Sequence, residues 1–264
     1  MSYKRHWDGK RGLSAIYEKQ TAACQQLEVS MLHLEKGEQQ HFPADAAREY
    51  ACVILGGSCD VNGDAVCFKN IGRRKNVFDG KAYAFYIPIK TEFTVTCLSD
   101  TLDIAIAMCP CTERFAPQLI TPEDVIVKFL GKPGFEREAH FLIDERIQAG
   151  RVYVGENFIE GGQWSSYPGH KHDVDRMPTE GFAEEIYYYE FDKPTGMGIQ
   201  KVYTGDKTID ETYTTYHRDF VEIPQGYHPC AAAPGYREYL LWMMSCDHRG
   251  FYMSIDPDHA FLNQ

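Results

Sequence analysis

Short strand-like segments separated by glycine and proline turns run along the whole of this 264-residue chain. Typical examples are YACVILGG (residues 50–57), EEIYYYEF (184–191) and YREYLLWMMS (236–245), which are rich in β-branched and aromatic residues. Helical periodicity is scarce, and we expect helices only around Leu13–Cys24 and Thr121–Phe129. Many short strands at near-regular spacing predict an all-β protein built from sandwiches or barrels.

The two halves of the sequence repeat the same order of features, which predicts a duplicated β-barrel. Each half has an aromatic-Pro step, then an acidic-aromatic strand, an Ile-Pro step and an apolar closing strand. The matching pairs are Phe42-Pro43 with Tyr167-Pro168, Glu49-Tyr50 with Glu185-Ile186, and Ile87-Pro88 with Ile223-Pro224. The polar, Gly-containing segment 131–151 is the expected boundary. We therefore predict one barrel over residues 1–140 and a second over residues 141–264.

Composition narrows the classes of partner. The chain is 44% apolar and 13% aromatic, which is typical of a globular protein. It has 27 basic and 38 acidic side chains, a net charge of −11, and no basic cluster, so we expect neither nucleic acid nor a membrane surface as a partner. Nine cysteines without a CxxC pair, and an N-terminus without an apolar signal-like segment, predict a reduced cytoplasmic protein.

Histidines in the second half indicate a metal site. His170 and His172, in YPGHKHD, would share one face of an extended strand, because side chains two apart point the same way. A single HxH in a loop is usually surface polarity, but His228 follows a second turn, Pro224-x-Gly226-x-His. Three imidazoles with one carboxylate form a set suited to Zn, Mn, Fe or Ni. We predict a divalent metal ion as the cofactor.

The order H-x-H, Glu, P-x-G-x-H resembles the two motifs of the cupin superfamily. The resemblance implies that each half is a double-stranded β-helix, or jelly-roll, and that the whole is a bicupin. Thirteen positions separate His172 from Glu185, more than in most cupins, so we interpret residues 173–184 as an insertion. Glu180 and Glu184, which lie within it, are alternative candidates for the carboxylate ligand of the metal. We choose Glu185, because it opens the aromatic strand as in related uronate isomerases.

The first half is not expected to hold a metal. Its counterpart region, HFPADAAREY, has no HxH pair, and Glu92 stands where the Ile-Pro alignment would place His228. We predict that this half keeps the fold with a degenerate site.

A closer resemblance links the chain to the 5-deoxyglucuronate isomerases of bacterial myo-inositol catabolism. It rests on the segments GGQWSSYPGHKHD, EEIYYYEF, QKVYTGDKTIDET, IPQGYHPCAAAPGY and DPDHAFL, and it is densest from Arg151 to Phe261. It implies a metal-dependent aldose–ketose isomerase that interconverts 5-deoxy-D-glucuronate and 2-deoxy-5-keto-D-gluconate. The chain departs from the family pattern at Gly169, Lys201, Gly205 and Trp242, so the resemblance specifies the reaction more closely than the sugar.

Isomerisation of a uronate needs a base for the proton beside the carbonyl and a cation for the carboxylate. Glu180, in the insertion, and Tyr203 are the candidate bases. Lys201 or Arg249 is expected to bind the carboxylate, with Arg74 of the first half as a more distant alternative. We expect Tyr187, Tyr188 and Tyr189 to form barrel wall, His248 and His259 to be polar surface groups, and residues 247–264 to form a closing tail.

Three alternatives stay open. One is an isomerase of the related uronate 5-keto-4-deoxyuronate, the second is a metal-dependent oxidase or dioxygenase, and the third is a sugar-binding cupin without catalysis. Because cupin barrels commonly associate through sheet edges, we also expect a homo-oligomer with a small sugar acid as the other partner.

Overall fold

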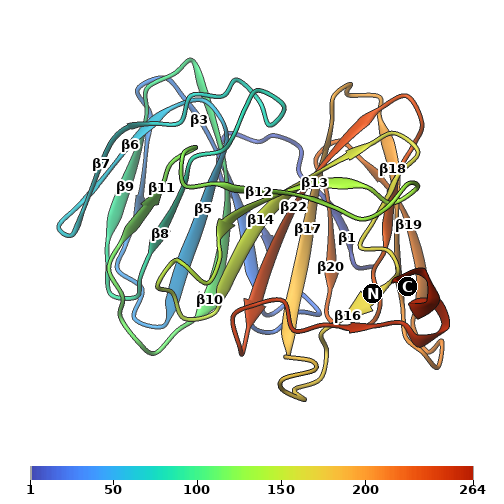
Figure 1. The fold of residues 1–264 in the computed structure, drawn as a ribbon. Coiled ribbons are helices and arrows are strands. Elements are labelled where there is room, and N and C mark those ends of the chain that lie inside the picture. The colour runs from blue at the N-terminus through green and yellow to red at the C-terminus, as the bar shows by residue number, and fades with distance from the viewer. Residues whose placement is uncertain (1, 264) are drawn as a thin grey trace.

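The computed structural model describes residues 2–263, which form two β-barrels side by side (Figure 1). The helical part of these residues is a short 3-10 helix, η1 (Pro257–Asn263). The predicted all-β, two-barrel architecture is confirmed. No helix in the described part of the chain is long and apolar enough to span a membrane.

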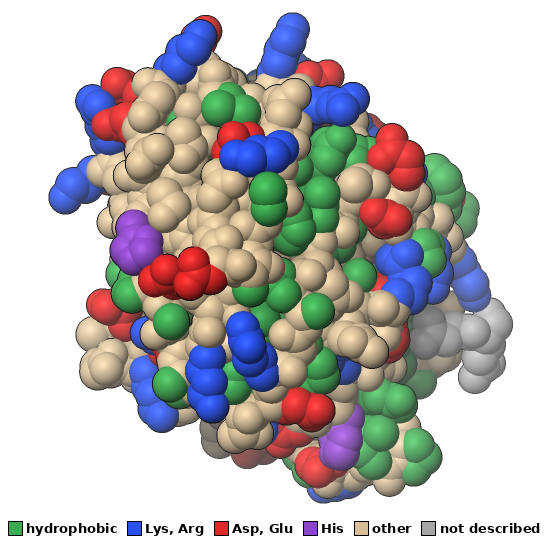
Figure 2. Space-filling model, turned by 90° about the vertical axis from the view of Figure 1, so that its left-hand side faces the viewer, with side chains coloured by type: hydrophobic (Ala, Val, Ile, Leu, Met, Phe, Trp, Pro, Cys, Tyr) green, Lys and Arg blue, Asp and Glu red, His purple; other side chains and the backbone are tan. Residues whose placement is uncertain are grey.

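The N-terminal barrel is closed by a six-stranded sheet, in the order β11-β8-β5-β10-β3-β2, and a four-stranded sheet, β4-β9-β6-β7. Its outer face, seen in Figure 2, carries acidic and basic side chains interspersed with apolar ones. The strands are β2 (Gly12–Tyr17), β3 (Glu28–Glu35), β4 (Gln39–Phe42), β5 (Arg48–Gly56), β6 (Cys59–Gly63), β7 (Val66–Ile71), β8 (Ala84–Ile87), β9 (Phe93–Cys97), β10 (Thr101–Pro110) and β11 (Gln118–Ile120).

The C-terminal barrel has a seven-stranded sheet, β1-β20-β17-β22-β14-β13-β12, a four-stranded sheet, β15-β21-β18-β19, and the pair β16-β23. Its strands are β1 (Lys4–His6), β12 (Ile126–Leu130), β13 (Arg137–Ile143), β14 (Val152–Glu160), β15 (Trp164–Ser165), β16 (His170–Lys171), β17 (Ala183–Phe191), β18 (Met197–Tyr203), β19 (Asp210–Tyr216), β20 (Asp219–Ile223), β21 (Cys230–Ala232), β22 (Arg237–Cys246) and β23 (Ser254–Ile255).

Strand alternation divides the apolar side chains among three cores. On β17, Ile186 and Tyr188 belong to the core between the barrels, whereas Tyr187 and Tyr189 belong to the interior of the C-terminal barrel. A separate core fills the N-terminal barrel. The large sheets are buried on both faces, which explains why their central strands are almost continuously apolar.

The first strand of each repeat pairs with a sheet of the other barrel. Strand β1 precedes the N-terminal barrel but pairs with β20 of the C-terminal one, and β11 precedes the C-terminal barrel but pairs with β8. Strands β12 and β13 pair with each other and β13 pairs with β14, so the C-terminal sheet already begins at Ile126. The sheets thus do not divide at residue 140, where composition suggested a boundary.

The strand pairing shows that one of the predicted matches between the two repeats is displaced by one residue. Tyr50 pairs with Ile87 in the first barrel, and Glu185 pairs with Ile223 in the second, so Tyr50 is the counterpart of Glu185. Glu49 instead matches Glu184. The Glu49 carboxylate accepts hydrogen bonds from the amides of residues 150–152, and that of Glu184 accepts them from the amides of residues 25–27. Both glutamates thus fasten one barrel to the other.

The two expected helices are absent from the described residues, and that prediction was wrong. Residues 12–17 form β2 against β3, and residues 126–130 form β12 against β13. The backbone groups of both segments are paired in sheet ladders. Tertiary pairing therefore overrides the weak helical pattern, as it commonly does for short segments.

Candidate metal centre and adjoining cavity

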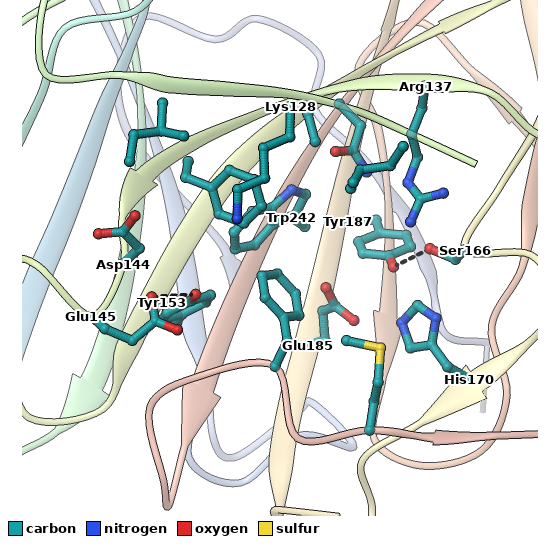
Figure 3. Close-up of a pocket in the computed structure, with 17 residues that line it drawn as sticks. Lys128, Arg137, Asp144, Glu145, Tyr153, Ser166, His170, Glu185, Tyr187 and Trp242 are labelled. Carbon is teal, nitrogen blue, oxygen red and sulfur yellow. Dashed lines mark hydrogen bonds between the residues drawn. The ribbon is translucent and has the colours of Figure 1, made fainter.

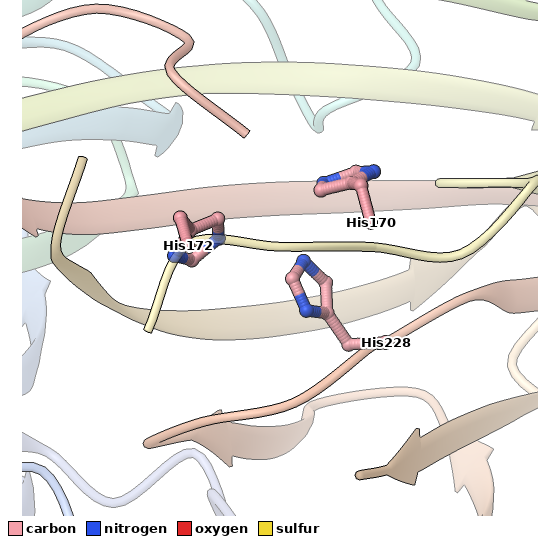
Figure 4. A group of neighbouring side chains, drawn as sticks. All are labelled: His170, His172 and His228. Atoms are coloured by element: carbon pink, nitrogen blue, oxygen red, sulfur yellow. The ribbon is translucent and has the colours of Figure 1, made fainter. Parts of the chain in front are cut away.

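Four side chains predicted as metal ligands lie together inside the C-terminal barrel. His170 lies on β16, His172 just after it, Glu185 on β17, and His228 after the turn that follows β20. One ring nitrogen from each of the three histidines lies within 4.8 Å of the others (Figure 4). Oε2 of Glu185 is 3.1 Å from Nε2 of both His172 and His228.

Backbone carbonyls orient two of these imidazoles. Nδ1 of His172 lies 2.9 Å from the carbonyl oxygen of Ala183, and Nδ1 of His228 lies 2.9 Å from that of Gly226, positions from which each nitrogen donates. Each Nε2 is then left to face the other ligands, as in known metal sites. Gly226 has a φ of 91°, a conformation that favours glycine, and this turn positions His228.

The electrostatics suit metal binding. Burial lowers the pKa of His170 well below its usual value, and the neighbouring His228 and His172 lower it further. Burial alone would raise the pKa of Glu185, but the adjacent imidazoles of His172 and His228 lower it to about 2. The same contact with Glu185 outweighs burial and raises the pKa of His172. An ionised carboxylate beside imidazoles is the donor set that a divalent cation requires.

One buried atom tests whether a metal would fit. Nε2 of His228 is fully enclosed and has no hydrogen-bond partner among the described residues, although the nitrogen is aimed at the centre of the group. A buried polar atom is costly unless something binds it. Three nitrogens and one oxygen match the ligands preferred by Zn, Mn, Fe and Ni, so the residues fit such an ion.

A cavity of about 330 Å³ opens beside these ligands (Figure 3). His170 and Glu185 form one end, with Ser166 and Tyr187 next to them; Oγ of Ser166 lies 3.1 Å from the hydroxyl of Tyr187. Glu145 lines the far end and accepts a hydrogen bond of 2.9 Å from Tyr153. The cavity can therefore hold a small molecule with polar groups along its length.

The C-terminal tail forms one wall of the cavity. Phe251 and Met253 line it, and β23 pairs with β16, which carries His170. The ring centroid of Trp242, one of the departures from the family pattern, lies 5.6 Å from that of Tyr153 and 5.3 Å from that of Phe251. Trp242 is thus part of the surface that a bound sugar would meet.

The two predicted bases lie outside this cavity. Oε1 of Glu180 accepts hydrogen bonds from Nζ of Lys171 at 2.7 Å and from the amides of Asp173 and Val174 at 3.0 and 3.1 Å, which ties down the insertion. The Tyr203 hydroxyl donates to Asp256 in the tail at 2.5 Å. Burial raises the pKa of Tyr203, which the hydrogen bond to Asp256 raises further. Both side chains have structural partners instead of facing the ligands.

The predicted carboxylate-binding cations are also held elsewhere. Lys201 pairs with Asp210 at 2.6 Å on the outer strands β18 and β19. The Arg249 guanidinium donates to the carbonyl oxygens of Asp144, Ile147 and Val152. Arg74 lies between the barrels and pairs with Glu156 at 2.6 Å. None of the three cations lines the cavity.

The residue that sequence reasoning missed is Arg137, whose guanidinium points into the cavity toward Tyr187 and Ser166 (Figure 3). The signal was present in the alternation of Arg137, Ala139 and Phe141, which all face the cavity. It went unread because REAHFLI was interpreted as part of a polar boundary instead of a strand.

The fold is that of a bicupin, and three histidines and one glutamate come together in its second barrel. Residues 3–262 match the KduI/IolB family, and the chain belongs to it. The chain is 36% identical to a 5-deoxy-glucuronate isomerase of Geobacillus thermodenitrificans over 216 residues, 81% of this chain and 78% of the relative. It is 32% identical to the Bacillus subtilis (strain 168) enzyme of the same name over 254 residues, 95% and 93% of the two chains.

Solved structures agree. An IolB-like protein from Salmonella typhimurium LT2 superposes with a TM-score of 0.94 at 32% identity, covering 99% of both chains. A mutant of Bacillus subtilis oxalate decarboxylase superposes with a TM-score of 0.66 at 12% identity, covering 96% of this chain and 78% of that one, which supports the fold alone. The expected family, the bicupin fold and the isomerase class are thereby confirmed.

Proposed function

We propose that this protein is a metal-dependent aldose–ketose isomerase that converts 5-deoxy-D-glucuronate to 2-deoxy-5-keto-D-gluconate in myo-inositol catabolism. The observation that carries the proposal is the group of three histidines and Glu185 at one end of a cavity of sugar size. The names of the relatives at 32–36% identity support the choice of substrate.

In this proposal His170, His172, His228 and Glu185 would hold the metal, with Zn, Mn, Fe and Ni as candidates. When bound, a divalent cation supplies the positive charge that stabilises negative charge developing on the carbonyl and neighbouring hydroxyl oxygens of the sugar. The imidazoles are kept in position by the carbonyls of Ala183 and Gly226, so this end of the cavity is organised before the sugar arrives.

The other side chains of the cavity orient the sugar and handle protons. The walls from Phe141, Trp242 and Phe251 exclude water from the reacting carbons. Burial raises the pKa of Tyr187 well above its usual value, so its hydroxyl, held by Ser166, is a neutral donor beside His170. Glu145 is the carboxylate at the far end. For proton transfer we prefer groups at the ligand end of the cavity over Glu180 and Tyr203, because a group that moves a proton must lie within hydrogen-bond reach of it.

A cytoplasmic location and self-association belong to the same proposal. All nine cysteines are free, which suits a reducing compartment. The sheets end in paired but accessible edge strands such as β12 and β19, along which barrels could associate.

Proton NMR in deuterated water tests the reaction. The metal-loaded protein is mixed with 5-deoxy-D-glucuronate under nitrogen, and we expect the ketose to form with deuterium at the carbon that gains a proton. Conversion without oxygen would exclude an oxidase. An unchanged spectrum, with one metal ion bound per chain, would contradict the proposed substrate, and 5-keto-4-deoxyuronate would be tried next.

Matched histidine variants test the metal site. His228→Ala should reduce metal content from about one ion per chain to nearly none, because it removes one of the four proposed ligands. His248→Ala is the control, since that exposed ring lies 3.4 Å from exposed Asp175 and outside the ligand group. Full metal content in His228→Ala, measured by elemental analysis, would rule out this ligand set.

A further inference from the structure

The cavity contains an arginine that has no hydrogen-bond or ion-pair partner among residues 2–263. Arg137 is partly enclosed, lines the cavity and lies beside Ser166, Tyr187 and His170 (Figure 3). Among the described residues, no carboxylate lies within ion-pairing distance of its guanidinium. Other arginines nearby are paired: Arg146 with Asp144, Arg151 with Asp247, and Arg237 with Glu138 and Glu160. In a chain with 38 acidic residues, this lack of a partner calls for an explanation.

Burial makes an unpaired positive charge at this position unfavourable. Desolvation lowers the pKa of Arg137 from its usual range, which means that its charge is poorly solvated where it lies. Enclosed charges are normally paired, and an anion from outside would supply the missing partner. The position therefore indicates an anionic ligand.

We propose that Arg137 binds the carboxylate of the sugar acid and so makes the enzyme selective for uronates over neutral aldoses. This inference rests on the proposed function and specifies the substrate contact within it. The carbonyl end of the sugar lies at the histidines and Glu185, and the carboxylate end lies at Arg137. A guanidinium suits this task because its planar fork can donate two parallel hydrogen bonds to one carboxylate.

Strand β13 holds Arg137 in this orientation. The next residue, Glu138, points to the opposite face, where its carboxylate lies 2.7 Å from Nε2 of His140 and 3.3 Å from Arg237. Arg137 itself pairs with Leu130 of β12 in the sheet. Because alternate residues of a strand face opposite ways, fastening Glu138 outside the barrel turns Arg137 toward the cavity.

The other cation of the cavity is less suited to the role. Nζ of Lys128 lies 4.6 Å from the centroid of the Phe141 ring and is engaged there as a cation over an aromatic face. Lys201 and Arg249 have their own partners outside the cavity, as described above.

Substrate selectivity tests the proposal. Arg137→Met and Arg137→Lys are assayed with the uronate and with the neutral aldose in which an alcohol replaces the carboxylate. We expect Arg137→Met to lower kcat/KM for the uronate by roughly 10²–10³-fold, with little change for the neutral aldose. Arg137→Lys should fall between, because it keeps the charge but loses the fork. Lys201→Met is the matched comparison.

A binding measurement separates this inference from the proposed reaction. The reduced uronate, with an alcohol at C1, cannot isomerise, and calorimetry gives its affinity for each variant; metal content and Tm establish that each variant is folded and loaded. Weaker binding of this acid by Arg137→Met, but not of its carboxamide, supports the inference even if the wild type converts nothing. Unchanged selectivity and affinity in Arg137→Met, or their loss in Lys201→Met instead, would overturn it.

Discussion

Glu238 is a carboxyl group buried without compensation inside the C-terminal barrel. It lies on β22, is fully enclosed, and neither of its oxygens has a hydrogen-bond partner among the described residues. Gly198 makes room for it, because an added Cβ there would lie 2.2 Å from Oε2. Burial raises the pKa of Glu238 to about 8. The native state therefore keeps this carboxyl protonated at neutral pH.

We predict that Glu238→Gln removes a pH dependence of stability. Between pH 4.5 and 8 the unfolded chain releases this proton while the folded chain keeps it, so the wild type loses stability as pH rises. The variant should gain about 3–4 kcal/mol relative to wild type between pH 5 and pH 8. Denaturant unfolding at the two pH values measures the difference. Exposed Glu211→Gln serves as the control, and an unchanged slope in Glu238→Gln would refute the prediction.

At the scale of elements, the exchanged strand β1 joins the two barrels. Trp7, directly after β1, is 2% exposed and lies in the core between the barrels. Its amide donates to the carbonyl of Arg218 at 3.0 Å, and the Arg218 guanidinium lies 4.8 Å from its ring. The N-terminal residues of the chain thus complete the C-terminal barrel.

Trp7→Ala should therefore destabilise a barrel formed mostly from distant sequence. Removing a buried Trp costs about 3–5 kcal/mol, which lowers Tm by roughly 10 °C in a chain of this size. Thermal unfolding followed by circular dichroism measures the change. Trp164→Ala, at a position 37% exposed, should shift Tm far less. Equal shifts in the two variants would argue against the joining role of β1.

For the whole molecule, a buried ion pair connects the barrels. Arg74, on the segment between β7 and β8, donates to the carbonyl of Ile54 in its own barrel and to Glu156 on β14 of the other at 2.6 Å. The Tyr239 hydroxyl donates to the same carboxylate at 2.8 Å. Burial alone would raise the pKa of Glu156, but Arg74, His140 and Tyr239 together lower it to about 2.

This pair predicts how the molecule responds to acid. Its stabilisation is present above pH 4.5 and is lost as pH falls toward 2, because Glu156 is protonated more readily in the unfolded chain. Arg74→Met should cost about 3–5 kcal/mol at pH 7 by leaving Glu156 unpaired, and should flatten the acid-dependent loss. Urea unfolding from pH 7 to pH 3 measures both effects.

The control for that experiment is Arg48→Met, which removes a half-exposed pair with Glu28 and Asp45 in the N-terminal barrel alone. Such a surface pair is worth at most about 1 kcal/mol. If Arg74→Met were no more destabilising than Arg48→Met, the buried pair would not be a connection between the barrels.

By itself the sequence determined the all-β class, the duplication and the group formed by His170, His172, Glu185 and His228. These features follow from the local sequence. Alternation determines the face of a strand on which a side chain lies, and the P-x-G turn positions His228 just beyond it. The choice of Glu185 over Glu184 depended on its place at the start of the aromatic strand, as in related uronate isomerases, and the two carboxylates do face opposite ways.

Tertiary structure alone decided which side chains meet across strands and loops. Glu180, Lys201 and Arg249 have the right chemistry for catalysis, yet each is bound by a neighbour that folding brings to it. Arg137 reaches the cavity because β13 pairs into the second barrel. The exchange of β1 and β11 and the one-residue register between the repeats likewise depend on strand pairing. The local sequence determines which side chains share a face of a strand. The strands beside it are determined by hydrogen bonds to segments far away in the chain.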